Sequence, residues 1–145
     1  MKKRNAFARI RGREKNPGLH GLVRFLQRPN GVLVIAEVFG LPQESACGIF
    51  AMHIHEGEEC SGTIKDEFSN AKTHYNPNGA QHPCHAGDLP PLFSNNGYAY
   101  MQVFTNRFTT EEIVGRTLII HDHPDDFMTQ PSGNAGNKIA CGVIM

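Results

Sequence analysis

The sequence predicts an all-β protein, folded as an antiparallel barrel or sandwich. Apolar and polar residues alternate along several short segments, as they do in strands that bury one face. The 145 residues include 15 Gly and 9 Pro, more than in an average soluble protein, which indicates many turns. No segment offers ten residues of clean helical periodicity. Short strands between frequent turns are typical of antiparallel barrels and sandwiches.

The first half of the chain holds four expected strands. Residues 8–13 alternate small or apolar side chains with arginines, which suits a half-buried strand. A second strand is expected over 19–26, and the Pro-Asn-Gly turn within 28–31 follows it. The β-branched residues of 32–39 predict a third strand, and the alternation of 48–55 predicts a fourth.

The second half holds three expected strands and two turn-rich stretches. The alternation stops over 56–96, which is full of Gly, Pro, Asn, His and acidic residues. Strands are expected over 98–104, 116–120 and 139–144, and 122–136 is the second turn-rich stretch. A stretch of about 40 residues without regular structure in a small protein is normally functional or disordered. Because histidines gather in it, we interpret the first stretch as functional.

Length and charge exclude several classes of protein. The chain is expected to form one domain, residues 1–145, with a buried core. Lys plus Arg and Asp plus Glu number 14 each, so no nucleic-acid partner is expected. The longest aliphatic run, 32–36, is too short to cross a bilayer, so no membrane partner is expected. Basic residues concentrate in 1–28, which we interpret as a solvated terminus and strand surface.

The chain start and the cysteines bear on the compartment. The basic residues 2–4 look like the beginning of a signal peptide, but no apolar segment follows them. A cytoplasmic location is therefore predicted, or an extracytoplasmic one if a signal has been removed. The four cysteines allow three full pairings, and their spacing alone does not choose among these pairings.

The histidines carry the strongest functional signal. His53 and His55 are two apart on an expected strand, so their side chains project to one face. His121 ends a later expected strand. Three histidines and an aspartate have the spacing H-x7-H-x2-H-x2-D in the first turn-rich stretch: His74, His82, His85 and Asp88. A lone histidine is most often structural, but this clustering predicts metal binding. Three imidazoles and a carboxylate suit structural zinc, and an all-imidazole set suits copper.

Several ordered motifs between residues 48 and 144 resemble the copper/zinc superoxide dismutase family. Each motif alone is weak, and together they are specific, whereas the amino-terminal third matches only as strands. The matching segments are, in chain order, the copper strand (M-H-I-H-E-G at 52–57, then Cys60), the bridging-histidine motif (H-Y-N-P at 74–77), the zinc loop (82–90), the last copper ligand with its support (115–121, Asp125 and Asp126) and the carboxy-terminal signature (G-N-A-G at 133–136, then 140–144).

The resemblance implies a Greek-key antiparallel β-barrel with two long loops that carry the metal site. The implied ligands are, for copper, His53, His55, His74 and His121, and for zinc, His74, His82, His85 and Asp88. His74 would thus be shared by both metals. The resemblance also implies that Asp125 links His53 to His82, since such outer partners set ring orientation and ligand basicity.

The implied activity is superoxide dismutation, an antioxidant oxidoreductase reaction. Copper would cycle between Cu(II) and Cu(I) while two superoxide anions become dioxygen and hydrogen peroxide. His74 would leave copper, take up a proton and deliver it. Lys138 stands where the family usually has Arg, three residues before Cys141. Because Lys is a compact point charge and Arg a planar fork, we expect Lys138 to attract superoxide but to position it less well.

The cysteines and the remaining histidines complete the expectations. Cys60 and Cys141 stand where the family forms its intrachain disulfide. Cys47 lies beside an apolar strand and is expected to be buried. No role is assigned to Cys84, and the histidines His20 and His123 are expected to be structural or at the surface. A homodimer is compatible with the family, although no motif marks its surface.

Two other functions stay open at this stage. The first is a copper- and zinc-binding protein of the same fold with weak or no dismutase activity. All four implied copper positions are filled, and only Lys138 favours this alternative. The second is a zinc-only hydrolase with one open coordination position, against which the seven matched ligands argue.

Overall fold

The computed structural model describes residues 4–43 and 46–145, and these form an all-β structure, as predicted. Two three-residue turns, Ala46–Gly48 and Ser69–Ala71, are 3-10 helical. The elements are β1 (Ala6–Gly12), β2 (His20–Arg28), β3 (Gly31–Phe39), β4 (Ile49–Phe50), β5 (Met52–His55), β6 (Leu92–Phe93), β7 (Ala99–Thr105), α1 (Thr110–Ile113), β8 (Thr117–His121) and β9 (Lys138–Val143).

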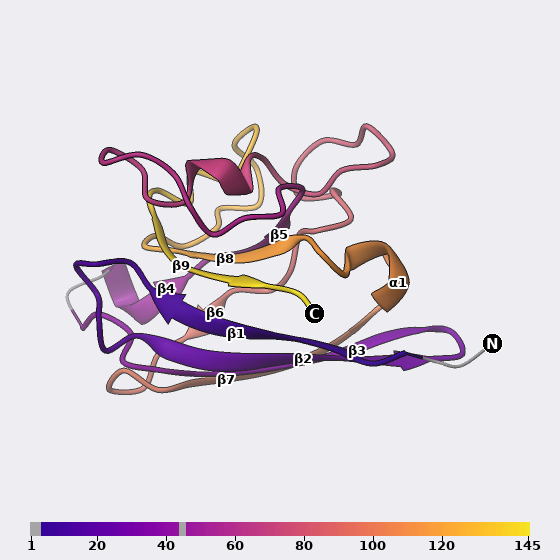
Figure 1. Cartoon of the computed structure of the whole chain (residues 1–145), viewed down its shortest axis with the longest axis horizontal. Helices are drawn as coiled ribbons and strands as arrows, with labels where there is room; N and C mark the ends of the chain where they lie inside the picture. Colours follow the sequence, from indigo (N-terminus) through magenta and orange to yellow (C-terminus); the bar gives the residue numbers. More distant parts are fainter. Residues whose placement is uncertain (1–3, 44–45) are drawn as a thin grey trace.

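The strands form one curled antiparallel sheet and one small pair. The sheet has the order β5-β8-β9-β1-β2-β3-β7, and β4 pairs with β6. The β5, β8 and β9 strands lie over β1, β2, β3 and β7, with the apolar core between the two layers (Figure 1). Because β1 neighbours β9 and β3 neighbours β7, long connections return to the first hairpin, as in a Greek key.

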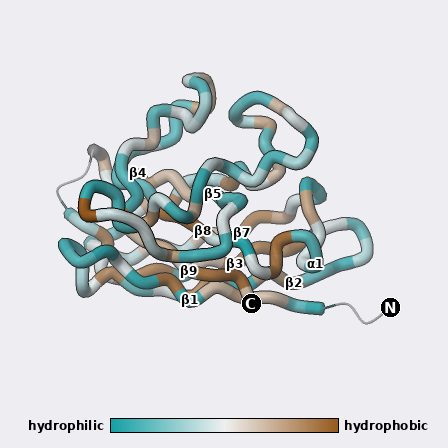
Figure 2. The backbone as a smooth tube through the Cα atoms, turned by 45° about the horizontal axis from the view of Figure 1, so that its top comes forward, coloured by the Kyte–Doolittle hydropathy of each residue, from teal (hydrophilic) through white to brown (hydrophobic). Residues whose placement is uncertain are grey.

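Alternation along the first strands arises from their single buried face. Ala8 and Ile10 of β1 are buried, whereas Arg9 and Arg11 between them are exposed. The same alternation continues through most of β2 and β3. Figure 2 shows the consequence along the chain, since apolar segments gather in the strands and the long loops are largely hydrophilic.

In contrast, β5 and β8 are buried on both faces. Met52 and Ile54 of β5 join the main core, so the side chains between and after them point to the opposite face. Ile119 of β8 packs there in a second small core with Phe68 and Ala71. The two long loops cover this outer face (Figure 1), and the space under them holds the candidate site.

The predicted single strand over 48–55 is wrong, because the chain changes partner at Ala51. The amide of Ala51 donates to the carbonyl of His123 at 3.0 Å, and its carbonyl accepts from the amide of His121 at 2.8 Å. Residues before the break pair with β6, and residues after it pair with β8. The β6 strand itself lies in 56–96, where no strand was predicted. Side-chain alternation does not report which strand is the partner, so it cannot locate such a break.

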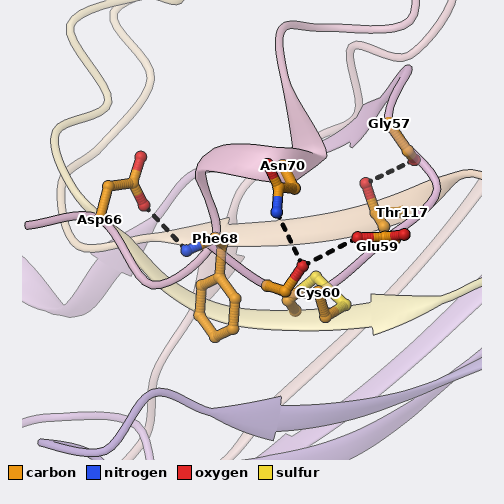
Figure 3. The surroundings of a disulfide bond; sticks show 9 residues. Gly57, Glu59, Cys60, Asp66, Phe68, Asn70 and Thr117 are labelled. Atoms are coloured by element: carbon orange, nitrogen blue, oxygen red, sulfur yellow. Dashed lines mark hydrogen bonds between the residues drawn. A yellow bond between two sulfur atoms is a disulfide. The ribbon is translucent and has the colours of Figure 1, made fainter. Parts of the chain in front are cut away.

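A disulfide joins Cys60 to Cys141 of β9, which confirms the pairing that the family resemblance implied. It ties the first long loop to the sheet beside the second core (Figure 3). The hydroxyl of Thr117 on β8 donates to the carbonyl of Gly57 at 3.1 Å, which holds the start of the same loop.

The other two cysteines are free and exposed. The expected burial of Cys47 is therefore wrong. Cys47 lies in a 3-10 turn before β4, with a positive φ of 58°, so it does not take a strand position with an inward face. His20 and His123 lie at the surface, as predicted. Within the described residues, no helix is long and apolar enough to cross a bilayer.

Candidate metal centre

Strand pairing and two backbone bridges bring the predicted ligands together. Isolated bridges pair His55 with His74 and His53 with Asp88, so the first loop runs alongside β5. His121 ends β8, the direct neighbour of β5. Residues from four separate segments therefore meet on the outer face of β5 and β8.

A four-histidine cluster forms on this face from His53, His55, His74 and His121. All four side chains are buried, and each offers a ligand atom within 4.8 Å of the others. Each ring also has one buried nitrogen without a hydrogen-bond partner: Nδ1 of His53 and Nε2 of His55, His74 and His121. Buried polar atoms are normally paired, so four converging unpaired nitrogens fit a metal ion.

The remaining nitrogens of these rings are held from outside the cluster. Nδ1–H of His55 donates to the carbonyl of Lys72 at 2.8 Å, and Nδ1–H of His121 donates to the carbonyl of Gly136 at 3.4 Å. Donation through Nδ1 leaves the lone pair on Nε2, the atom that faces the cluster. Sequence reasoning missed both carbonyls, because a backbone acceptor leaves no signal in the side-chain pattern.

A second cluster, called the Asp88 cluster, lies directly beside the four-histidine cluster and consists of His74, His82, His85 and Asp88. Oδ1 of Asp88 lies 2.8 Å from Nδ1 of His74, and Oδ2 lies 3.0 Å from Nδ1 of His82 and 3.3 Å from Nδ1 of His85. Neither Asp88 Oδ1 nor His82 Nδ1 has a hydrogen-bond partner. The Nδ1 atoms of His74 and His85 are 3.1 Å apart. These ring nitrogens and carboxylate oxygens converge as metal ligands do.

Asp125 connects the two clusters. Its Oδ2 accepts from Nε2–H of His53 at 2.8 Å, and its Oδ1 accepts from Nε2–H of His82 at 2.7 Å. Burial alone would raise the pKa of Asp125, but these hydrogen bonds, with one from the amide of Phe127, hold it below its usual value. Gly133 must be glycine here, because a Cβ would lie 2.0 Å from Asp125 Oδ1 and its φ is +70°.

Burial also controls the protonation of the histidines. Burial, together with the positive charge of neighbouring histidines, lowers the pKa of His121 to about 3. Burial holds the pKa of His55 well below its usual value in the same way. Both rings are therefore neutral near pH 7, which is the form that binds metal ions.

We expect the metal-free protein to lose about 2 kcal/mol of unfolding free energy between pH 7 and pH 5 from His121 alone. The unfolded chain takes up a proton near pH 6.5, whereas the folded chain does not until about pH 3. The contribution of His121 to the free energy of unfolding is therefore fully present above about pH 6.5 and is lost as the pH drops toward 3. The neutral His55 ring contributes in the same direction. Urea unfolding of the chelator-treated protein at fixed pH measures this change, and equal stability at pH 7 and pH 5 would contradict it.

Lys138 lies at the rim of the site and makes an ion pair that the sequence did not predict. It begins β9, and its backbone pairs with that of His121. Its Nζ donates to Oδ2 of Asp66 at 2.7 Å. Both side chains line a cavity of about 620 Å³, together with His55, His74 and His121. Asp66 belongs to no motif, so no signal in the sequence singled it out.

The family model for copper/zinc superoxide dismutase matches residues 19–144. The chain belongs to this family. "Superoxide dismutase [Cu-Zn] 2" of Aquifex aeolicus is 35% identical over 139 residues, which cover 86% of this chain and 78% of that protein. "Superoxide dismutase [Cu-Zn]" of Legionella pneumophila is 33% identical over 132 residues, covering 86% and 76%.

A solved structure supports the same assignment. The copper/zinc superoxide dismutase of Brucella abortus superposes with a TM-score of 0.81 at 26% sequence identity, covering 98% of this chain and all of that one. Copper and zinc are the metals of the family, and the donors present fit both. The four-histidine cluster offers only imidazoles. A second group of donors that lie within 4.8 Å of one another adds a carboxylate and consists of His53, His74, His82 and Asp88. The predicted ligand His85 is outside this group and lies beside it, with Nδ1 3.3 Å from Oδ2 of Asp88.

Proposed function

We propose that the protein catalyses the dismutation of superoxide at a copper–zinc centre. The observation that carries this proposal is the placement of the His74 ring. Its Nε2 is one of the unpartnered nitrogens of the four-histidine cluster, and its Nδ1 lies 2.8 Å from Asp88 in the other cluster. One imidazole thus serves two neighbouring donor sets, an arrangement that a single-metal hydrolase does not need.

The ligand assignment follows the two clusters. The copper ligands in this proposal are His53, His55, His74 and His121. The zinc ligands are His74, His82, His85 and Asp88. Asp125 acts from outside, because its hydrogen bonds to His53 and His82 couple the orientation of one ring in each set.

Copper, when bound, supplies the one-electron steps that oxidise one superoxide to dioxygen and reduce a second superoxide to the peroxide level. The peroxide leaves as hydrogen peroxide after it takes up two protons. His74 provides a site for one of them, since Nε2 is the ring atom without a partner while Asp88 and His85 lie against Nδ1. Lys138 carries positive charge to the cavity through which the anionic substrate enters.

The test of this function is metal content and dismutase rate measured on one purified sample loaded with copper and zinc. We expect one copper and one zinc per chain and turnover that cyanide inhibits. Full copper occupancy without turnover would instead support the binding protein of the same fold. Hydrolytic activity without copper would support the zinc hydrolase.

We propose an extracytoplasmic location, because disulfides persist mainly in oxidising compartments. The bond between Cys60 and Cys141 is the feature that favours this location over the cytoplasmic one. A single domain over 1–145, a homodimer, and the lack of nucleic-acid or membrane partners all stay predictions.

Lys138→Arg is expected to raise the dismutation rate constant about twofold to fivefold. The guanidinium can keep its bond to Asp66 and still offer N–H groups to a small anion. Rates of superoxide decay with fully metallated proteins measure this effect. Lys65→Arg, the same exchange at another lining residue of the cavity, is the control and should leave the rate unchanged. An Arg variant at 138 that is no faster than wild type would show that the lysine does not limit the rate.

A further inference from the structure

The cavity over the four-histidine cluster has a mixed charged lining. Five cations reach it: Arg13, Lys15, Lys65, Lys72 and Lys138. Three acids reach it as well: Glu56, Asp66 and Glu67. Among the residues that the structure describes, Lys138 is the only one of these cations in an ion pair with a carboxylate, and its partner is Asp66. The cation that begins the strand beside His121 is thus the one whose charge is compensated.

Asp66 is held firmly by its own loop. Its Oδ1 accepts from the amide of Phe68 at 3.0 Å, and its carbonyl accepts from the amides of Thr63 and Ser69 at 2.8 and 3.2 Å. Phe68 packs in the second core beside the disulfide (Figure 3). The loop therefore fixes the carboxylate through Oδ1, and the other oxygen, Oδ2, accepts the hydrogen bond from Lys138.

The pairing changes what an approaching anion meets. An ammonium 2.7 Å from a carboxylate acts at a distance as a dipole, whose potential falls off faster than that of a single charge. Near contact, the anion competes with Oδ2 for the same compact ammonium group. Steering of the anion and its final binding are both weakened as a result.

We propose that Asp66 is a positioning residue that restrains Lys138 and lowers the affinity of the copper site for small anions. This inference rests on the proposed function, because it assigns the cavity as the path of the anionic substrate. Asp66 is not one of the proposed metal ligands. It acts only through its ion pair with the ammonium group of Lys138.

The test is an azide titration of the copper- and zinc-loaded protein, followed by the absorption spectrum of Cu(II) at low ionic strength. Asp66→Asn keeps an oxygen for the amide of Phe68 and removes the charge that binds Lys138. We expect azide to bind this variant about fivefold more tightly than wild type. The difference should shrink above about 0.15 M salt, because screening weakens the exposed charges.

Two controls isolate the ion pair. Glu67→Gln removes one negative charge from the same cavity, and Glu67 accepts a hydrogen bond from the amide of Glu14 rather than from Lys138. Its azide affinity should stay within twofold of wild type. In a Lys138→Gln background, Asp66→Asn should have no further effect. Equal tightening in Glu67→Gln, tightening that persists without Lys138, or unchanged or weaker binding in Asp66→Asn would overturn the inference.

The outcomes separate this inference from the proposed function. A protein that binds copper and azide as expected but does not dismutate superoxide contradicts only the proposed function. A protein that dismutates superoxide while Asp66→Asn leaves azide binding unchanged contradicts only the role of Asp66.

Discussion

Replacing His74 with alanine is expected to lower dismutase activity at least 100-fold and to weaken the binding of both metals. Loss of a partner outside the ligand set already costs about tenfold to 100-fold in affinity or activity, and His74 lies in both donor sets. Its Nε2 belongs to the four-histidine cluster, and its Nδ1 lies 2.8 Å from Asp88. Metal analysis of the dialysed variant and the rate of superoxide decay measure the two effects.

The matched control is His20→Ala. His20 is exposed and its ring contacts the carbonyl of Gly18 and the ring of Phe39, far in sequence from either cluster. This variant should keep its metal content and activity within twofold of wild type. A His74→Ala protein that retains full copper, full zinc and full turnover would refute the shared-ligand assignment.

Removing the disulfide by the double change Cys60→Ala and Cys141→Ala is expected to lower the free energy of unfolding by about 4 kcal/mol. The bond closes a loop with a sequence separation of 81 residues, and constraints on long loops in the unfolded chain stabilise by about this amount. For a chain of this size the melting temperature should fall by roughly 10–15 °C. Thermal and urea unfolding of the metal-loaded proteins give both quantities.

The same double change should also loosen the part of the first loop that holds Asp66 at the rim of the metal site. Cys141 and Cys60 pack with Phe68 in the second core, and Phe68 shares its turn with Asp66. Cys47→Ala is the control, since this free cysteine is exposed and lies in no disulfide. A double variant as stable as Cys47→Ala would show that the loop is held by packing alone.

Local patterns predicted the fold class because one-sided burial imposes a period of two on a strand. The alternation of Ala8 and Ile10 with arginines located β1 within two residues of its bounds. The same rule failed at Ala51, where the backbone changes partner and both segments remain apolar. It also failed for β6, because two residues are too few to establish a period.

The sequence by itself determined which donors exist, since His53 and His55 must share a face of one strand and the loop histidines carry an aspartate at ligand spacing. Only the tertiary structure decided which ring nitrogen of each histidine faces each cluster, because the outer contacts come from distant carbonyls and from Asp125. It also decided that Lys138 is paired, since its partner Asp66 lies 72 positions away. Contacts of that kind depend on how the loops pack over the sheet, and a local pattern contains no record of them.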